Sequence, residues 1–269
     1  MFFILLFSLL QGFTEFLPVS SQGHLIVFNE FFGFDSMVQI SIHQATILAH
    51  FGSFFAVILY YFRTLKNFAS SIRMIDRPDI DKNSFLLLNL SISTLPIIVL
   101  GYFFSLVFNY DSKNIIMIIA ITSIIFGILL FIIDSFCLRI KDQSALNFYT
   151  SFLIGICQCA ALIPGVSRSG AILTAMRFFG FQRKFCVRYS NLLSIPVILA
   201  ATCLMLISTF ENFSLTMIFN LSAIMIFVFS FVFSLFFIFF LVVWVRRFSL
   251  LIFAVYRLIF GGFLIYYLV

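Results

Sequence analysis

The sequence predicts an all-α integral membrane protein with about six transmembrane helices and two re-entrant helical hairpins in an inverted-topology repeat. Three observations predict this class. Hydrophobic residues make up 63% of the 269 residues and charged residues only 10%, whereas a soluble domain has roughly 45–50% apolar and 25% charged residues. Apolar runs of about 20 residues, the length that crosses a bilayer, recur along the chain. Two further apolar stretches are broken by proline, serine and glycine. We therefore expect one membrane domain over residues 1–269.

Hydropathy along the chain predicts six full-length spans. They lie at about residues 43–62, 85–108, 114–134, 190–210, 215–243 and 250–269. The fifth is longer than a bilayer requires, which predicts that it tilts or extends beyond the hydrocarbon.

The two broken stretches cover residues 1–28 and 148–176, and they are interrupted by PVSSQG at 18–23 and PGVSRSG at 164–170. Neither half of either stretch is long enough to cross the membrane. Broken backbone at membrane depth is tolerated only where it is buried in protein or lines a cavity. We therefore predict two helix–loop–helix hairpins that each enter and leave the membrane on one side.

The loop charges predict the orientation of the chain. Lys and Arg concentrate in the loops at 63–84, 135–147 and 177–188 and at 246–247, and they are absent from the first 62 residues. Under the positive-inside rule these loops are cytoplasmic, and the alternation holds only if both hairpins are re-entrant. It places both termini on the outer side. The basic residues form no basic arm, so we expect no nucleic-acid partner.

The two hairpins resemble each other when they are aligned at an offset of 147 residues. The matched pairs are Gln11 with Gln158, Val19 with Val166, Ser20 with Ser167 and Gly23 with Gly170. Each half, at about 1–134 and 148–269, then contains a hairpin and three spans, and a cytoplasmic loop at 135–147 links them. Three crossings per half give the halves opposite orientations. Such an inverted repeat brings broken helices together near the midplane.

The hairpins carry three ionisable residues: Glu15 and His24 flank the first loop, and Arg168 lies in the second. Each costs about 2.5–3.5 kcal/mol or more inside a membrane, so such residues are functional candidates. Arg168 lies between Ser167 and Ser169, and a guanidinium with hydroxyls and helix N-terminal amides suits a phosphate. Alternatively, Arg168 pairs with Glu15 only to hold the halves together.

The first loop offers groups for acid–base chemistry. Glu15 is a candidate general base or ligand of a divalent cation, or a buried acid held by hydroxyls. His24 follows Ser20 by four residues and Ser21 by three, so it is a candidate base for either hydroxyl or a proton donor to a leaving group. Gln11 precedes Glu15 by four residues and supplies a further polar contact or packs structurally.

Other potentially reactive residues are expected to be structural. His43 and His50 lie seven residues apart on one face of the first span with no carboxylate between them, and His43 is expected to border the site. The five cysteines form no disulfide or metal motif, and we expect them to pack as small hydrophobic residues.

The segment QGFTEFLPVSSQGH at 11–24, together with PGVSRSG at 164–170, closely resembles the two signatures of the bacterial undecaprenyl-diphosphatase (bacitracin-resistance) family. The resemblance covers essentially the whole chain. It implies a bacterial plasma-membrane enzyme that removes the terminal phosphate of undecaprenyl diphosphate and so regenerates the lipid carrier for cell-wall synthesis. It also implies a divalent cation, Mg²⁺ or Ca²⁺.

The resemblance and the loop chemistry together give a set of expected site residues. We expect catalytic roles for Glu15, Ser21, His24 and Arg168, substrate binding by Gln11, Ser20, Ser167, Ser169, Gly170 and Thr174, and metal binding by Glu15. Ser21 is the preferred nucleophile with His24 as its base, although direct attack by His24 or by a metal-activated water fits the same residues.

Three positions depart from the family pattern. Ile172 stands where the family commonly has threonine, so Thr174 would have to supply that hydroxyl. Arg188 and Asn191 stand where the family usually has Glu and Phe.

A membrane translocator of a lipid phosphate or anion is the alternative function, because inverted repeats with midplane sites are typical of transporters. The Ser, His and Glu residues exceed what binding alone requires, so the sequence favours the phosphatase. The expected partners are a polyprenyl diphosphate and membrane lipid. A homodimer is compatible with the sequence, which does not fix the oligomeric state.

Overall fold

The computed structural model describes residues 1–34, 38, 40–107, 112–208 and 220–268, and these residues are almost entirely helical. Six helices are long and apolar enough to cross a membrane. They are α4 (Ile42–Tyr60), α6 (Lys82–Val107), α7 (Ser112–Phe136), α10 (Arg183–Ser208), α12 (Leu221–Trp244) and α13 (Leu251–Leu268). The prediction of an all-α membrane protein with six spans is confirmed.

The helix boundaries follow the prediction closely, with one clear difference. Helix α10 begins at Arg183, seven residues before the predicted start at 190, because its polar first turns bind the end of α7. Helix α4 begins with a capping box in which the Ser41 hydroxyl and the Gln44 side chain each bind the other residue's backbone amide. The predicted boundaries at 108, 210, 215 and 269 lie outside the described residues.

Both broken stretches form two short helices joined by a loop. The first contains α1 (Phe2–Phe16) and α2 (Ser21–Phe32), and the second contains α8 (Phe148–Gln158), the 3₁₀ turn η3 (Cys159–Leu162) and α9 (Arg168–Phe178). In each pair the two helices pack against each other. The helix–loop–helix form is therefore as predicted, and its re-entrant placement in a membrane stays a prediction.

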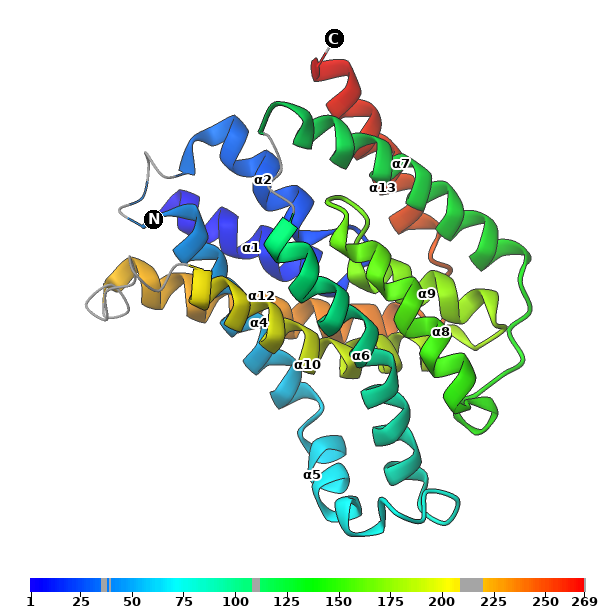
Figure 1. The fold of residues 1–269 in the computed structure, drawn as a ribbon. Coiled ribbons are helices and arrows are strands. Elements are labelled where there is room, and N and C mark those ends of the chain that lie inside the picture. The colour runs from blue at the N-terminus through cyan, green and yellow to red at the C-terminus, as the bar shows by residue number, and fades with distance from the viewer. Residues whose placement is uncertain (35–37, 39, 108–111, 209–219, 269) are drawn as a thin grey trace.

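The packing surrounds the two hairpin loops with long helices. Helix α1 packs along α12, and α8 packs along α6, which are equivalent pairs under the 147-residue offset. Figure 1 shows α7 and α13 side by side along one edge, with α5 (Phe62–Ser71) and the first turns of α6 projecting from the opposite end. The division of the chain into two inverted halves stays a prediction.

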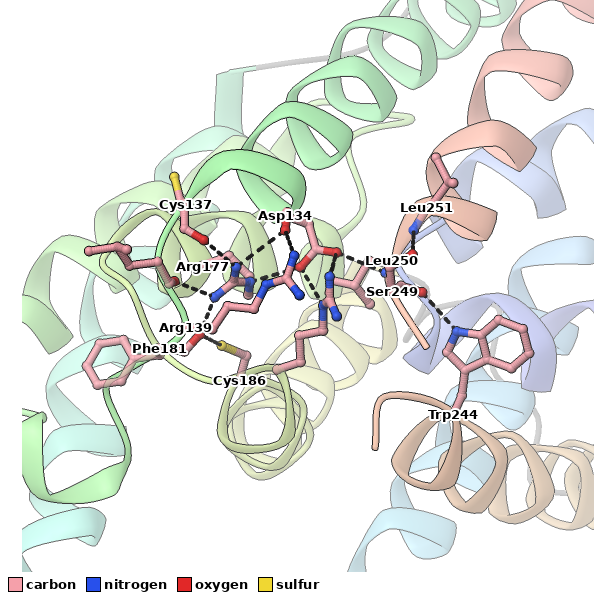
Figure 2. A network of polar contacts seen from close by, with 12 residues as sticks. Asp134, Cys137, Arg139, Arg177, Phe181, Cys186, Trp244, Ser249, Leu250 and Leu251 are labelled. Atoms are coloured by element: carbon pink, nitrogen blue, oxygen red, sulfur yellow. Dashed lines mark hydrogen bonds and ion pairs between the residues drawn. The ribbon is translucent and has the colours of Figure 1, made fainter. Parts of the chain in front are cut away.

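A buried ionic network joins the ends of four helices (Figure 2). Asp134, near the end of α7, accepts hydrogen bonds from Arg177 Nε at 2.9 Å and from Arg183 Nη2 at 2.7 Å. It also accepts one from the backbone amide of Leu250 at 3.0 Å, directly before α13. Because Arg177 lies on α9 and Arg183 begins α10, a single carboxylate fixes four helices at one end of the molecule.

Candidate active site

In each hairpin, a serine with a strained backbone caps the start of the second helix. Ser20 has a φ of 80° and Ser167 a φ of 70°, and within the described ranges they are the non-glycine residues with positive φ. Each caps its helix, because Ser20 Oγ accepts from the Gly23 amide at 3.4 Å and Ser167 Oγ accepts from the Gly170 amide at 3.1 Å. Such backbone strain costs about 1–3 kcal/mol and gathers at functional sites. The pairing of Ser20 with Ser167 in the sequence thus corresponds to the same local geometry.

The two loops touch each other directly. Ser169 Oγ donates to the Leu17 carbonyl oxygen at 2.8 Å. Gly23 and Gly165 lie at the crossing, where a Cβ built on Gly23 would be 3.4 Å from Gly165 Cα. Gly165 has a φ of +89°, and a Cβ there would collide with the side chain of Thr122 on α7. The crossing therefore requires a glycine at 165 for both its conformation and its space.

Arg257 on α13 lies behind both loops and was not singled out by the sequence analysis. Its side chain is 1% exposed. Its partners in the described part of the chain are backbone carbonyl oxygens at 2.8–3.3 Å: those of Pro18 in the first loop, Gly165 and Val166 in the second, and Thr122 and Ser123 on α7. An arginine within an apolar span is a functional candidate by composition, so the signal was present in the sequence.

The structure brings Glu15 and Arg168 together, as predicted. Arg168 Nη2 donates to Glu15 Oε1 at 3.2 Å, and Gln11 Nε2 donates to Glu15 Oε2 at 3.1 Å. His50 of α4 lies there too, with its Nδ1 3.4 Å from Glu15 Oε2. We expected His50 to be structural, and the sequence did not predict its place beside Glu15. The sequence could not show it, because the contact depends on α4 packing against α1.

One amphipathic cavity of about 920 Å³ lies in front of these groups. Its polar side chains come from both hairpins and from α4, and they include Glu15, Ser20, Ser21, His43, His50, Ser167 and Arg168. Helices α6 and α10 supply much of its apolar wall, including Ile97, Ile98, Tyr102, Val197, Ala201 and Leu204. The cavity thus combines a small charged end with a long hydrocarbon surface, and it borders His43 as predicted.

His24 does not face this cavity. Its Nδ1 lies 2.7 Å from the Ser20 carbonyl oxygen, so Nδ1 carries the proton, and its Nε2 lies 2.8 Å from the Tyr256 hydroxyl. The ring stacks on Phe260 with 4.0 Å between centroids. His24, the expected base of Ser21, therefore directs both ring nitrogens to other partners, because the ring points from α2 toward α13.

The remaining predicted binding residues are not among those that line the cavity. Gln11 holds Glu15, and Ser169 joins the two loops. Gly170 packs on Arg257, since a Cβ there would be 3.0 Å from Arg257 Nη1. Thr174 is buried on α9, and no described residue binds its hydroxyl.

The three departures from the family pattern also lie away from the cavity lining. Ile172 is fully buried in the hydrophobic core. Arg188 Nη1 donates to Gln143 Oε1 at 3.5 Å, and Asn191 Nδ2 donates to the Tyr61 hydroxyl at 3.3 Å.

Two buried polar atoms beside Glu15 have no partner among the described residues. They are Arg168 Nη1, a donor, and Gln11 Oε1, an acceptor. Buried polar atoms in native proteins usually have hydrogen-bond partners, so these two are candidates to bind a ligand. The described part of the chain has no cluster of three His, Cys, Asp or Glu residues for a metal ion. Magnesium commonly needs only one or two protein oxygens when phosphates supply others, so Glu15 with Gln11 Oε1 fits such a shared cation.

Comparison with known proteins identifies related sequences. The family model for bacitracin resistance protein BacA matches residues 4–263. The chain is 37% identical over 262 residues to the undecaprenyl-diphosphatase of Pelagibacter ubique, covering 95% of this chain and 93% of that protein. It is 32% identical over 269 residues to the undecaprenyl-diphosphatase of Alteromonas mediterranea, covering 99% and 98% of the two chains. These matches span nearly all of both chains, and the protein therefore belongs to the bacitracin resistance protein BacA family.

Proposed function

We propose that this protein is an undecaprenyl-diphosphate phosphatase. It hydrolyses the terminal phosphate of undecaprenyl diphosphate, which gives undecaprenyl phosphate and inorganic phosphate and recycles the lipid carrier for cell-wall synthesis. The observation that carries the proposal is the cavity, in which an acid, hydroxyls and an arginine lie at one end and the apolar faces of α6 and α10 form the walls. The names of the relatives supply the identity of the substrate.

The polar end of the cavity suits the diphosphate group. Arg168 offers the unpartnered Nη1 to a phosphate oxygen, and this charge-assisted bond would satisfy a buried donor. Helix α9 begins at Arg168, so its first backbone amides add the partial positive charge of a helix N-terminus. The prenyl chain would lie along the apolar walls.

The reaction requires an in-line attack on the terminal phosphorus. The attacking oxygen, from Ser21 or a water, gives its proton to Glu15, the candidate general base in the cavity, and bonds to phosphorus while the bridging P–O bond breaks and its electron pair leaves with the lipid phosphate. If Ser21 attacks, a water then hydrolyses the phosphoserine, which releases inorganic phosphate and restores the hydroxyl. Arg168 stabilises the charge that develops on the phosphoryl oxygens, and Glu15 holds Arg168 in place. Ser21 remains the preferred nucleophile because it lines the cavity next to Ser20.

A divalent cation belongs to this proposal. Glu15 and the unpartnered oxygen of Gln11 would hold it, and it would neutralise phosphate charge. Mg²⁺ and Ca²⁺ both take such oxygen ligands.

The placement in the cell is also part of the proposal. Six apolar spans support a multi-pass protein of the bacterial plasma membrane, and the loop charges support an outer location for both termini. Association into a homodimer stays a prediction from the sequence.

Phosphate release by the purified protein from a long-chain polyprenyl diphosphate tests the function. We expect release by the wild-type protein and none by Arg168→Ala, which removes the unpartnered donor. Protein that carries a lipid phosphate across vesicles without releasing phosphate would instead establish the translocator.

A further inference from the structure

The neighbouring residues Tyr256 and Arg257 of α13 support the loops from behind the cavity: Arg257 binds the backbone of both loops, and Tyr256 binds the side chain of His24. Arg257 Nη1 donates to the Pro18 carbonyl at 3.3 Å and to the Val166 carbonyl at 2.8 Å. One nitrogen therefore binds the first loop and the second loop at once. Arg257 Nη2 also binds the Gly165 carbonyl at 2.8 Å.

Among the described residues, backbone carbonyl oxygens alone accept hydrogen bonds from the Arg257 guanidinium. No carboxylate among the described residues forms an ion pair with Arg257. Its planar fork of five N–H donors can reach several acceptors in fixed directions, which a lysine ammonium cannot do. The geometry thus depends on the shape of the guanidinium in addition to its charge.

Tyr256 reaches the first loop through His24. The Tyr256 hydroxyl donates to His24 Nε2 at 2.8 Å, which leaves the ring proton on Nδ1. That proton binds the Ser20 carbonyl at 2.7 Å. Because Ser20 is one of the two strained serines, the Nδ1 hydrogen bond lies at the point where the first loop needs support.

We propose that His24, Tyr256 and Arg257 form a loop clamp, a set of positioning residues that keeps the two loops in register. The clamp aligns Ser21 of the first loop with Arg168 of the second across the cavity. His24 acts in it as a hydrogen-bond donor to backbone, not as the base of the reaction. The catalytic part of this inference rests on the proposed phosphatase function.

Substitution of His24 separates the two roles. In His24→Asn, the amide nitrogen can take the place of Nδ1 and donate to the Ser20 carbonyl, but an amide cannot accept a proton in the reaction. His24→Ala provides neither group. We expect His24→Ala to lower kcat about 10²-fold, the size expected for a misplaced catalytic group. The kcat of His24→Asn should be at least about tenfold higher than that of His24→Ala.

The chain offers matched controls for the two α13 residues. Tyr189→Phe removes another buried hydroxyl, which binds the Asn89 carbonyl at 2.9 Å away from the loops. Arg177→Lys alters another fully buried arginine that binds backbone carbonyls. We expect Tyr256→Phe and Arg257→Lys to lower kcat at least about tenfold more than their controls, measured below the unfolding temperature of every variant.

Hydrogen–deuterium exchange gives a readout that does not depend on activity. Without the clamp, the backbone at 17–23 and 164–170 should exchange faster in Arg257→Lys and His24→Ala. In Arg177→Lys the faster exchange should lie instead around Asp134.

The outcomes distinguish the clamp from the proposed function. Wild-type protein that releases no phosphate from a polyprenyl diphosphate would overturn the function, while faster loop exchange would still support the clamp. Active wild-type protein with His24→Asn as inactive as His24→Ala would overturn the positioning role of His24. Loop exchange unchanged in Arg257→Lys would overturn the clamp.

Discussion

Replacing Asp134 with asparagine should destabilise the protein strongly. Asparagine keeps the size of the side chain and one acceptor oxygen, but it removes the negative charge that lies between two arginines. Its amide N–H groups would also face the donors of Arg183 or Arg177. The change therefore leaves two cations in the protein interior without their counter-ion.

The structure sets the expected magnitude of this loss. Arg177 is fully buried and Asp134 is 3% exposed at its side chain, so that pair keeps nearly its full strength. Arg183 is 14% exposed at its side chain, and solvent weakens its contribution somewhat. Removing one partner of a buried ion pair typically costs about 3–5 kcal/mol. We expect a loss of about that size for Asp134→Asn, because the Leu250 amide also depends on the same carboxylate.

Equilibrium unfolding in detergent measures this prediction. The control is Asp79→Asn, the same chemical change at an exposed position, which should alter the free energy of unfolding by less than about 0.5 kcal/mol. If Asp134→Asn unfolds within about 1 kcal/mol of the wild type, a value typical of single surface contacts, the reasoning about the buried network is refuted.

Four further predictions concern the site. Gly165→Ala should lower the free energy of unfolding by about 2 kcal/mol or more, because it adds both a positive-φ penalty and a collision with Thr122; thermal unfolding would show it. Arg168→Lys should lower kcat for phosphate release at least about tenfold, since lysine cannot bind Glu15 and a phosphate with a planar fork; an unchanged kcat would contradict the phosphate role. Ser21→Ala should abolish turnover if Ser21 is the nucleophile, and near-normal turnover would favour a water. Chelation with EDTA should stop phosphate release by the wild-type protein, and added Mg²⁺ should restore it; full activity in excess chelator would remove the cation from the proposal.

The sequence predicted the contact between Glu15 and Arg168 because burying a charged residue in a membrane costs free energy. Charged residues inside a membrane must pair or bind a ligand, and Glu15 and Arg168 lie in the two matched hairpins. Their ion pair at 3.2 Å agrees with that reasoning. The helical spacing predicted that the His24 ring reaches back four residues to Ser20, and it does. The ring binds the Ser20 carbonyl oxygen, however, and not the Ser20 hydroxyl.

The sequence by itself determined the membrane class, the six spans and the positions of the two loops. These features depend on local hydrophobicity and on where proline, serine and glycine interrupt it. Only the tertiary structure decided which residues stand behind the loops. His50, Tyr256 and Arg257 belong to spans that are far from the loops in sequence, and their contacts arise when α4 packs on α1 and α13 packs on α7. A side chain's direction within such packing depends on all of its neighbours at once, so its hydropathy and spacing alone cannot fix it.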